Sequence, residues 1–261
     1  MLRQWLQSKQ RDPSPSKDFR VVDVSEHNQP SAPVKSELAR LLRQERFDPR
    51  FLFAMARHLG WGRVEDLVRR GLAHGQTARK GDFGEVLLSA LLETFHGYSV
   101  PVRKMRSRVS SDQSQPRIDL VALRFDTGRL VEICLAESKL RTRNDTNAGV
   151  EAHDQLWTES SQRLPDILTF VAYRLHELQS PVFDAFAAYL RDRADTRPME
   201  SHVIGLTWAS DHWSETVLGN LHDRGVELAS LSVHVVPLKD LESLIKDVFE
   251  LAGLEASNDE D

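Results

Sequence analysis

The sequence predicts a protein of the α/β class, in the α+β sense, because strand-like and helix-like segments follow one another in a mixed order. Apolar residues typical of strands recur at residues 118–124, 130–140, 202–209 and 228–238. Apolar residues at helical spacing precede, separate and follow these strands. The 261 residues are enough for one large domain, or for a core domain with a smaller one attached.

The first 78 residues are predicted to be an arm followed by a small, mostly helical module. Up to about residue 34, stretches rich in Pro, Ser and polar residues predict a loosely structured arm. Within that arm, only residues 19–26 have the pattern of a strand. Residues 34–74 carry apolar side chains at helical spacing. We therefore expect a module of residues 1–78 and a second domain of residues 79–261.

The second domain is predicted to begin with a helix over residues 81–95, followed by a strand over residues 98–109 that contains several basic residues. The next two strands, 118–124 and 130–140, form a hairpin, since Asp126-Thr127-Gly128 between them is a turn signal.

The remainder of this domain is predicted to be mostly helical. A long helical stretch over residues 149–178 is interrupted near Pro165, and a shorter helix follows it. Two further strands lead to a closing helix over residues 238–254 and an acidic tail.

Composition excludes several classes of protein. Cys134 is the only cysteine, which rules out an intrachain disulfide and a cysteine-rich zinc site. No apolar run approaches the ~20 residues that a membrane span needs, and the N-terminus lacks the apolar stretch of a secretion signal. We therefore expect a cytoplasmic protein without membrane association. No GxxxxGK[ST] motif is present, so the chain is not expected to hydrolyse ATP by itself.

The net charge of −5 conceals a strong asymmetry along the chain. Residues 1–78 carry 14 Lys and Arg against 9 Asp and Glu, and residues 79–143 carry 12 against 8. Residues 144–261 carry 8 against 22, a balance of −14. A basic N-terminal part and an acidic C-terminal part are typical of a protein that presents one face to a polyanion. An unevenly charged solvated surface explains the same numbers equally well.

Charged residues extend an apolar row at the end of the strand over residues 130–140. Because alternate residues of a strand share a face, Glu137 and Lys139 lie on the side of that apolar row, and Asp119 on the neighbouring strand can lie beside Glu137. Two adjacent carboxylates repel each other unless a cation lies between them, and Mg²⁺ (or Mn²⁺) fits that role. A lysine two residues further on can polarise an attacking water. A surface hairpin that ends in a salt bridge is the alternative.

In this order of elements the chain resembles the PD-(D/E)xK nuclease superfamily over roughly residues 80–210. The resemblance implies a restriction-endonuclease-like αβββαβ core, in which helices flank a mixed central sheet. It implies that Asp119 and Glu137 bind the metal with the carbonyl of Ser138 as a third ligand, and that Lys139 positions or activates the water. Ile118 stands where the superfamily's name has proline, at a position that varies among its members.

Two further positions match the superfamily. Glu85, in KGDFGE, matches the glutamate that many members carry on the first helix, and Gln155 matches a glutamine that some branches carry on a later helix. An acidic residue in the first turn of a helix, favoured by the helix dipole, is the alternative explanation for Glu85.

Basic residues flank the proposed site on both sides in the sequence. Four cations in six positions precede Asp119, namely Arg103, Lys104, Arg106 and Arg108, and two more follow Lys139, namely Arg141 and Arg143. We expect these six residues to bind the phosphates of a nucleic acid. A charged edge strand that deters aggregation is the alternative for the first four.

The motifs KGDFGEVLLSALLE and LAESKLR, followed by a helical and acidic C-terminal half, resemble the HamA-like nuclease subunit of the Hachiman antiphage system. This resemblance implies a Mg²⁺-dependent phosphodiesterase, an endodeoxyribonuclease that acts on DNA with a separate helicase or ATPase partner. Two alternatives remain open. One is an inactive module of the same fold that binds nucleic acid or a partner, and the other is a structural subunit that docks on a basic motor.

Overall fold

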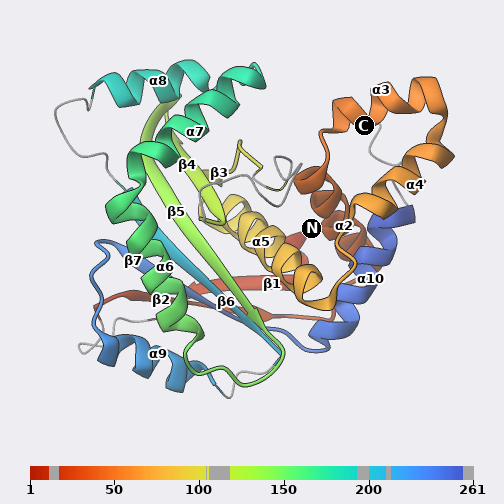
Figure 1. Ribbon diagram of the computed structural model, residues 1–261. Coiled ribbons are helices and arrows are strands. Elements are labelled where there is room, and N and C mark those ends of the chain that lie inside the picture. The colour runs from red at the N-terminus through yellow and green to blue at the C-terminus, as the bar shows by residue number, and fades with distance from the viewer. Residues whose placement is uncertain (12–17, 104, 106–117, 193–199, 210–212, 255–261) are drawn as a thin grey trace.

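The structure is a computed structural model that describes residues 1–11, 18–103, 105, 118–192, 200–209 and 213–254. Its centre is a seven-stranded sheet in the order β1-β2-β7-β6-β5-β4-β3 (Figure 1). The strands are β1 (Leu6–Gln10), β2 (Arg20–Glu26), β3 (Tyr98–Ser99), β4 (Leu120–Asp126), β5 (Arg129–Arg141), β6 (Glu200–Trp208) and β7 (Leu231–Pro237). The helices are α1 (Leu2–Trp5), α2 (Ala32–Arg46), α3 (Pro49–Leu59), α4 (Trp61–Gly71), α5 (Gln76–Phe95), α6 (Ala148–Gln162), α7 (Leu164–Glu177), α8 (Phe183–Asp192), α9 (Ser214–Arg224) and α10 (Leu241–Leu254).

The sheet is mixed, which confirms the predicted class. β5, β6, β7 and β2 run parallel, and β1, β4 and β3 pair antiparallel with their neighbours. β4 and β5 form the expected hairpin, in which Leu120 lies opposite Ala136. β5 is thus a long central strand between β4 and β6, and the carboxyl ends of β5, β6 and β7 meet at one edge of the sheet.

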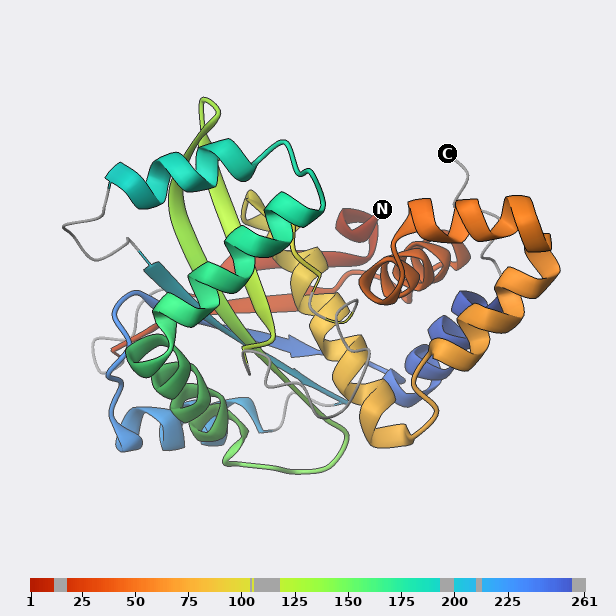
Figure 2. The ribbon, with the colours of Figure 1, turned by 45° about the horizontal axis from the view of Figure 1, so that its top comes forward.

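Helices cover both faces of this sheet. On one face α5 crosses the strands, and its Leu88 and Leu92 pack on Cys134 and Ala136 of β5. α2, α4 and α10 gather beside α5 and share a buried apolar cluster with it (Figure 2). On the other face, α6, α7, α8 and α9 pack against the alternate row of β5 that contains Ile133 and Leu135. The alternation of side chains along β5 therefore decides which helix layer each residue meets.

The N-terminal segment, which the sequence predicted to be a loosely structured arm, is instead part of the core. The strand expected at residues 19–26 is present as β2, and it pairs with β7 on one side and β1 on the other. Trp5 and Leu6 are almost fully buried, and the Trp5 indole donates a hydrogen bond to Glu26 (2.9 Å). The boundary expected after residue 78 falls inside α5.

The remaining differences are local. The strand expected at residues 98–109 is reduced to the two residues of β3, and residues 104 and 106–109 of that stretch lie outside the described part of the chain. α9 was not predicted at all. Within the described residues, no helix is long and apolar enough to cross a membrane.

Candidate active site

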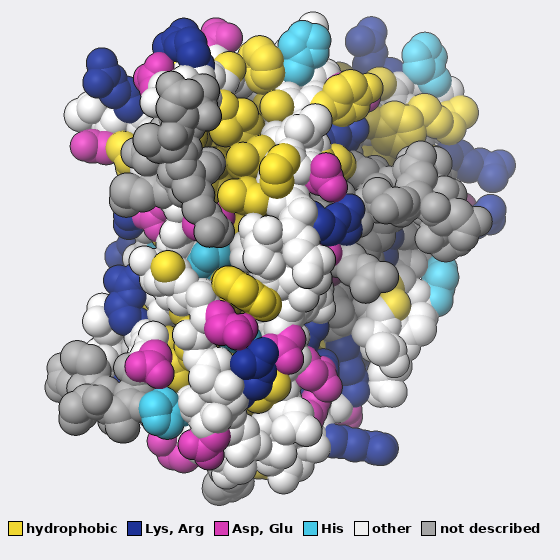
Figure 3. All heavy atoms as spheres, turned by 60° about the vertical axis from the view of Figure 1, so that its left-hand side comes forward, with side chains coloured by type: hydrophobic (Ala, Val, Ile, Leu, Met, Phe, Trp, Pro, Cys, Tyr) yellow, Lys and Arg dark blue, Asp and Glu magenta, His cyan; other side chains and the backbone are white. Residues whose placement is uncertain are grey.

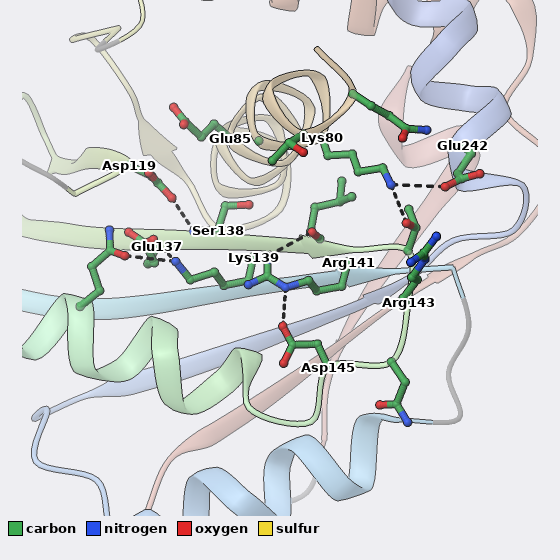
Figure 4. A pocket seen from close by; sticks show the side chains of 17 residues that line it. Lys80, Glu85, Asp119, Glu137, Ser138, Lys139, Arg141, Arg143, Asp145 and Glu242 are labelled. Carbon is green, nitrogen blue, oxygen red and sulfur yellow. Dashed lines mark hydrogen bonds and ion pairs between the residues drawn. The ribbon is translucent and has the colours of Figure 1, made fainter. Parts of the chain in front are cut away.

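A cavity of about 1050 Å³ opens at the carboxyl end of β5, between α5 and α6 (Figure 4). The end of β5 forms its floor, the first half of α5 forms one wall, and Gln155 of α6 and Glu242 of α10 complete the rim. Its charged lining residues are Lys80, Glu85, Asp119, Glu137, Lys139, Arg141, Arg143, Asp145 and Glu242. We call this cavity the cleft.

The two carboxylates at the centre of the prediction, Asp119 and Glu137, both line this cleft. Leu120 pairs with Ala136 in the antiparallel hairpin. Asp119 comes just before Leu120 and Glu137 just after Ala136, so the two carboxylates stand on the same side of the hairpin. The backbone N–H of Ser138 donates a hydrogen bond to Oδ2 of Asp119 (2.9 Å), which fixes that carboxylate over β5. The structure therefore brings these two carboxylates to one cavity.

Lys139 turns back along β5 toward Glu137 rather than into solvent (Figure 4). Its Nζ donates to Oε1 of Glu137 (2.8 Å) and to Oε1 of Gln155 (3.1 Å). The Glu137 side chain is only 2% exposed and that of Lys139 16%. Removing two charges from water is unfavourable, and exposed ion pairs contribute little stability, so a buried pair is not explained as a surface salt bridge. Buried charges of this kind gather at functional sites.

Glu85 reaches the cleft from the opposite wall, on α5 (Figure 4). α5 begins at Gln76 and has no acidic residue in its first turn, so the helix dipole does not explain Glu85. The preceding residue, Gly84, is where α5 comes closest to the site strand. A Cβ at Gly84 would lie 2.8 Å from Oγ of Ser138 and 3.3 Å from Cβ of Leu140. The glycine therefore allows Glu85 to lie at the cleft.

This close approach gives a testable difference between two glycines of α5. Gly81 has open space where a Cβ would stand, so Gly81→Ala is expected to raise the free energy of unfolding by up to about 1 kcal/mol through helix propensity. Gly84→Ala is expected to lower it by about 1 kcal/mol or more, because the added methyl group overpacks against β5. Urea denaturation of the two variants measures the difference. Equal stabilisation of both would show that Ser138 and Leu140 give way without strain.

The donor set of the cleft fits a hard divalent cation. Asp119, Glu137 and the carbonyl of Ser138 offer oxygen donors only. Among the described residues, no group of three or more His, Cys, Asp or Glu side chains could hold a metal ion by itself. Zinc sites need such a group, whereas Mg²⁺ is bound by one or two carboxylates and completes its shell with water and phosphate oxygens.

The cations around the cleft differ in how they are engaged. Arg141 is held by Asp145 and by Glu151 (3.0 Å), so it is already neutralised. Arg143 is exposed on the rim, and no ion pair is recorded for it within the described ranges. Lys80, which the sequence analysis did not select, donates to Thr142 (2.6 Å) and Glu242 (3.3 Å). It lies one helical turn before Gly84, so the helical spacing of the KGDFGE motif could have found it.

Arg103, expected on the phosphate-binding rim, is placed elsewhere. Its guanidinium pairs with Glu45 and Glu93 (3.2 Å) and donates to Ser89 (2.6 Å), in a largely buried network between α2 and α5. It is not among the residues that line the cleft. Lys104, Arg106 and Arg108 lie outside the described residues.

The fold and the cleft define an α/β protein with two carboxylates and a lysine at the end of a central strand. The family model of HamA matches residues 1–252 of the chain. The Hachiman protein HamA of Bacillus cereus is 23% identical to it over 265 residues, which cover 95% of this chain and 89% of that relative. The chain therefore belongs to the HamA family.

Proposed function

We propose that this chain is a metal-dependent nuclease that cuts DNA in bacterial antiphage defence, under the control of a helicase or ATPase partner. The observation that carries the proposal is the convergence of Asp119, Glu137 and Lys139 in one cleft. The spacing of these residues and the order of elements around them resemble those of the PD-(D/E)xK nucleases. Membership of the HamA family, which includes a Hachiman protein, supports the defence role.

Each residue of the cleft has a role in this proposal. Asp119, Glu137 and the Ser138 carbonyl would hold Mg²⁺ or Mn²⁺, which when bound would polarise the scissile phosphate and lower the pKa of a water molecule. Lys139, oriented by Gln155, would position the attacking water and offset the negative charge that develops on the phosphate. The Ser138 N–H keeps the Asp119 carboxylate in place before substrate arrives. Arg143 on the rim would contact the backbone of the nucleic acid.

The alternative, an inactive module that only binds nucleic acid or a partner, is favoured less by the cleft. A module that only binds phosphates has no use for two carboxylates, because each repels the polyanion. Here both carboxylates line the cleft, and a buried lysine contacts one of them.

The proposed partner surface is the acidic C-terminal half. On the face covered by α6 to α9, Figure 3 shows hydrophobic side chains in the upper part and Asp and Glu below them. Trp157 of α6 is 37% exposed and Tyr173 of α7 is 65% exposed. Exposed large apolar side chains surrounded by charged residues are typical of a protein–protein interface. A surface with excess negative charge also repels DNA.

Metal-dependent nicking of a supercoiled plasmid tests the enzymatic part of the proposal. With ATP and Mg²⁺ or Mn²⁺ the wild-type chain, together with its genomic neighbour, is expected to cut, and a chelator is expected to stop cutting. The double variant Glu137→Ala/Lys139→Ala is expected to be inactive.

Lys246→Ala/Glu250→Ala serves as the matched control, because it removes an exposed Glu–Lys pair on α10, 69% and 60% exposed. Parallel reactions with RNA in place of the plasmid determine whether the substrate is DNA or RNA. Equal cutting by the two double variants would contradict the assignment of the site.

A further inference from the structure

A second cavity lies on the α5 face of the sheet, at the end of α5 remote from the cleft. Its volume is about 370 Å³, and Phe95 and His96 at the C-terminal end of α5 lie beside strands β1, β2 and β7 there. In Figure 1, α5 runs from the end of β5 to the region of β3 and β4, so the two cavities lie at its two ends. Among the described residues, none lines both cavities.

The lining of this cavity is rich in arginine. Arg3, Arg20 and Arg124 line it, and none of its described lining residues is an Asp or Glu. Arg124 pairs with Glu132, and Arg3 donates to the carbonyl of Thr94 (2.6 Å). For Arg20, no ion pair is recorded within the described ranges. Glu132 neutralises Arg124, and the C-terminal end of α5 contributes about half a negative charge, so the net positive charge of the lining comes from Arg3 and Arg20.

A buried histidine adds an unsatisfied polar atom to the lining. His234 of β7 is 2% exposed, and among the described residues its Nδ1 has no hydrogen-bond partner. Its ring lies against that of His96, with 4.6 Å between the centroids. The pKa of His234 is lowered to about 3, mainly by burial and in addition by the neighbouring His96 and Arg20. The ring is therefore neutral near pH 7 and offers one donor and one acceptor, and buried polar atoms are rarely left without a partner.

We propose that this cavity binds a phosphate-bearing ligand of about the size of a mononucleotide, either a free nucleotide or the terminal nucleotide of a strand. Guanidinium groups match the geometry of phosphate and form charge-assisted hydrogen bonds with it. The volume lies at the small end of the range of ligand cavities, roughly 300–1,000 Å³, which suits one phosphate with a sugar and a base. His234 provides an unpartnered ring nitrogen for the remainder of such a ligand, whereas the hydroxyl of Tyr98 already contacts Glu132 (2.9 Å) and Ser201 (3.2 Å).

Calorimetric titration of the whole chain with AMP, and with adenosine as the probe without phosphate, tests the site. AMP is expected to bind at least tenfold more tightly than adenosine. Arg20→Gln is expected to weaken AMP binding by about tenfold or more, because one charge-assisted hydrogen bond is lost. Arg57→Gln is the matched control, since Arg57 is also exposed, lies on α3 and does not line the cavity. Equal melting temperatures of the two variants verify that both fold.

The source of the phosphate is decided by competition, carried out with Glu137→Gln protein so that no strand is cut. If a 5′-phosphorylated oligonucleotide displaces AMP and the 5′-hydroxyl form does not, the ligand of the cavity is the end of a strand. Displacement by neither form identifies a free nucleotide. AMP binding no tighter than that of adenosine, or the same loss in Arg20→Gln and Arg57→Gln, would overturn the site. Since the readout is binding, its failure is distinct from a failure of the proposed nuclease activity.

Discussion

Glu137→Ala is expected to abolish cleavage and leave nucleic acid binding largely intact. Loss of residues that only support metal ligands typically reduces activity or affinity by about 10- to 100-fold, so loss of a ligand itself should exceed a hundredfold. Binding should persist, because removing an anion from a phosphate site does not weaken its attraction for a polyanion. Plasmid nicking and filter binding, measured on the same preparation, separate the two effects.

The burial of Glu137 requires a second variant. Alanine leaves the Lys139 ammonium, only 16% exposed, without the carboxylate that it contacts, and removing one member of a buried pair can destabilise a fold by about 3–5 kcal/mol. Glu137→Gln keeps an oxygen that can accept from Lys139, and it is expected to fold with near-normal stability and to remain inactive. Lys139→Ala should also stop cleavage, with some loss of binding. Metal-dependent cutting that persists in both Glu137 variants would place the metal elsewhere.

Control by a partner is the second large effect that we expect. The acidic half, residues 144–261 with a balance of −14, is proposed to bind a helicase or ATPase encoded beside this chain. In complex, cutting should be suppressed until DNA and ATP are both supplied, because a nuclease without its own specificity would damage host DNA. The measurements are co-elution of the two proteins and nicking with and without ATP, each at low and moderate salt.

The surface on α6 and α7 can be tested directly. Tyr173→Ser is expected to weaken the complex, because exposed aromatic residues contribute strongly to interfaces. Phe51→Ser is the matched control, since Phe51 is 47% exposed but lies on α3, outside the acidic half. A chain that stays solitary and cuts freely in the presence of its neighbour would contradict control by a partner. In that case the acidity serves solubility alone.

The centre of the site could be predicted from sequence because it depends on local periodicity. Glu137 and Lys139 are two residues apart on one strand, and a short turn brings Asp119 next to them, so a period of two was sufficient. The position of Arg103 could not be predicted in this way. Its partners Glu45 and Glu93 lie on other elements, and only the packing of α2 against α5 brings them together.

The elements that were missed carry weak local signals. β1 has the sequence LQSKQ with a single fully buried residue, and it is a strand because β2 satisfies its backbone. α9, with the sequence SETVLGNLHDR, contains a glycine and few apolar residues. Val217, Leu218 and Leu221 stand at helical spacing and anchor it in the core beneath α6, but three apolar residues are a weak signal on their own.

The pairing of β2 with β7 has a consequence for how this chain is made. Val21 lies opposite Val233, so β2 pairs with a strand that follows it in the chain only after β3, β4, β5 and β6. Contacts between segments so distant in sequence form slowly, because a long loop must close before any stabilising contact is made. β5 becomes a central strand only when β6 has joined it, and β6 in turn needs β7 on its other side. A chain that stops before β6 contains Asp119, Glu137 and Lys139 but lacks the strand beside β5, so under the proposed function we expect such a fragment to be inactive.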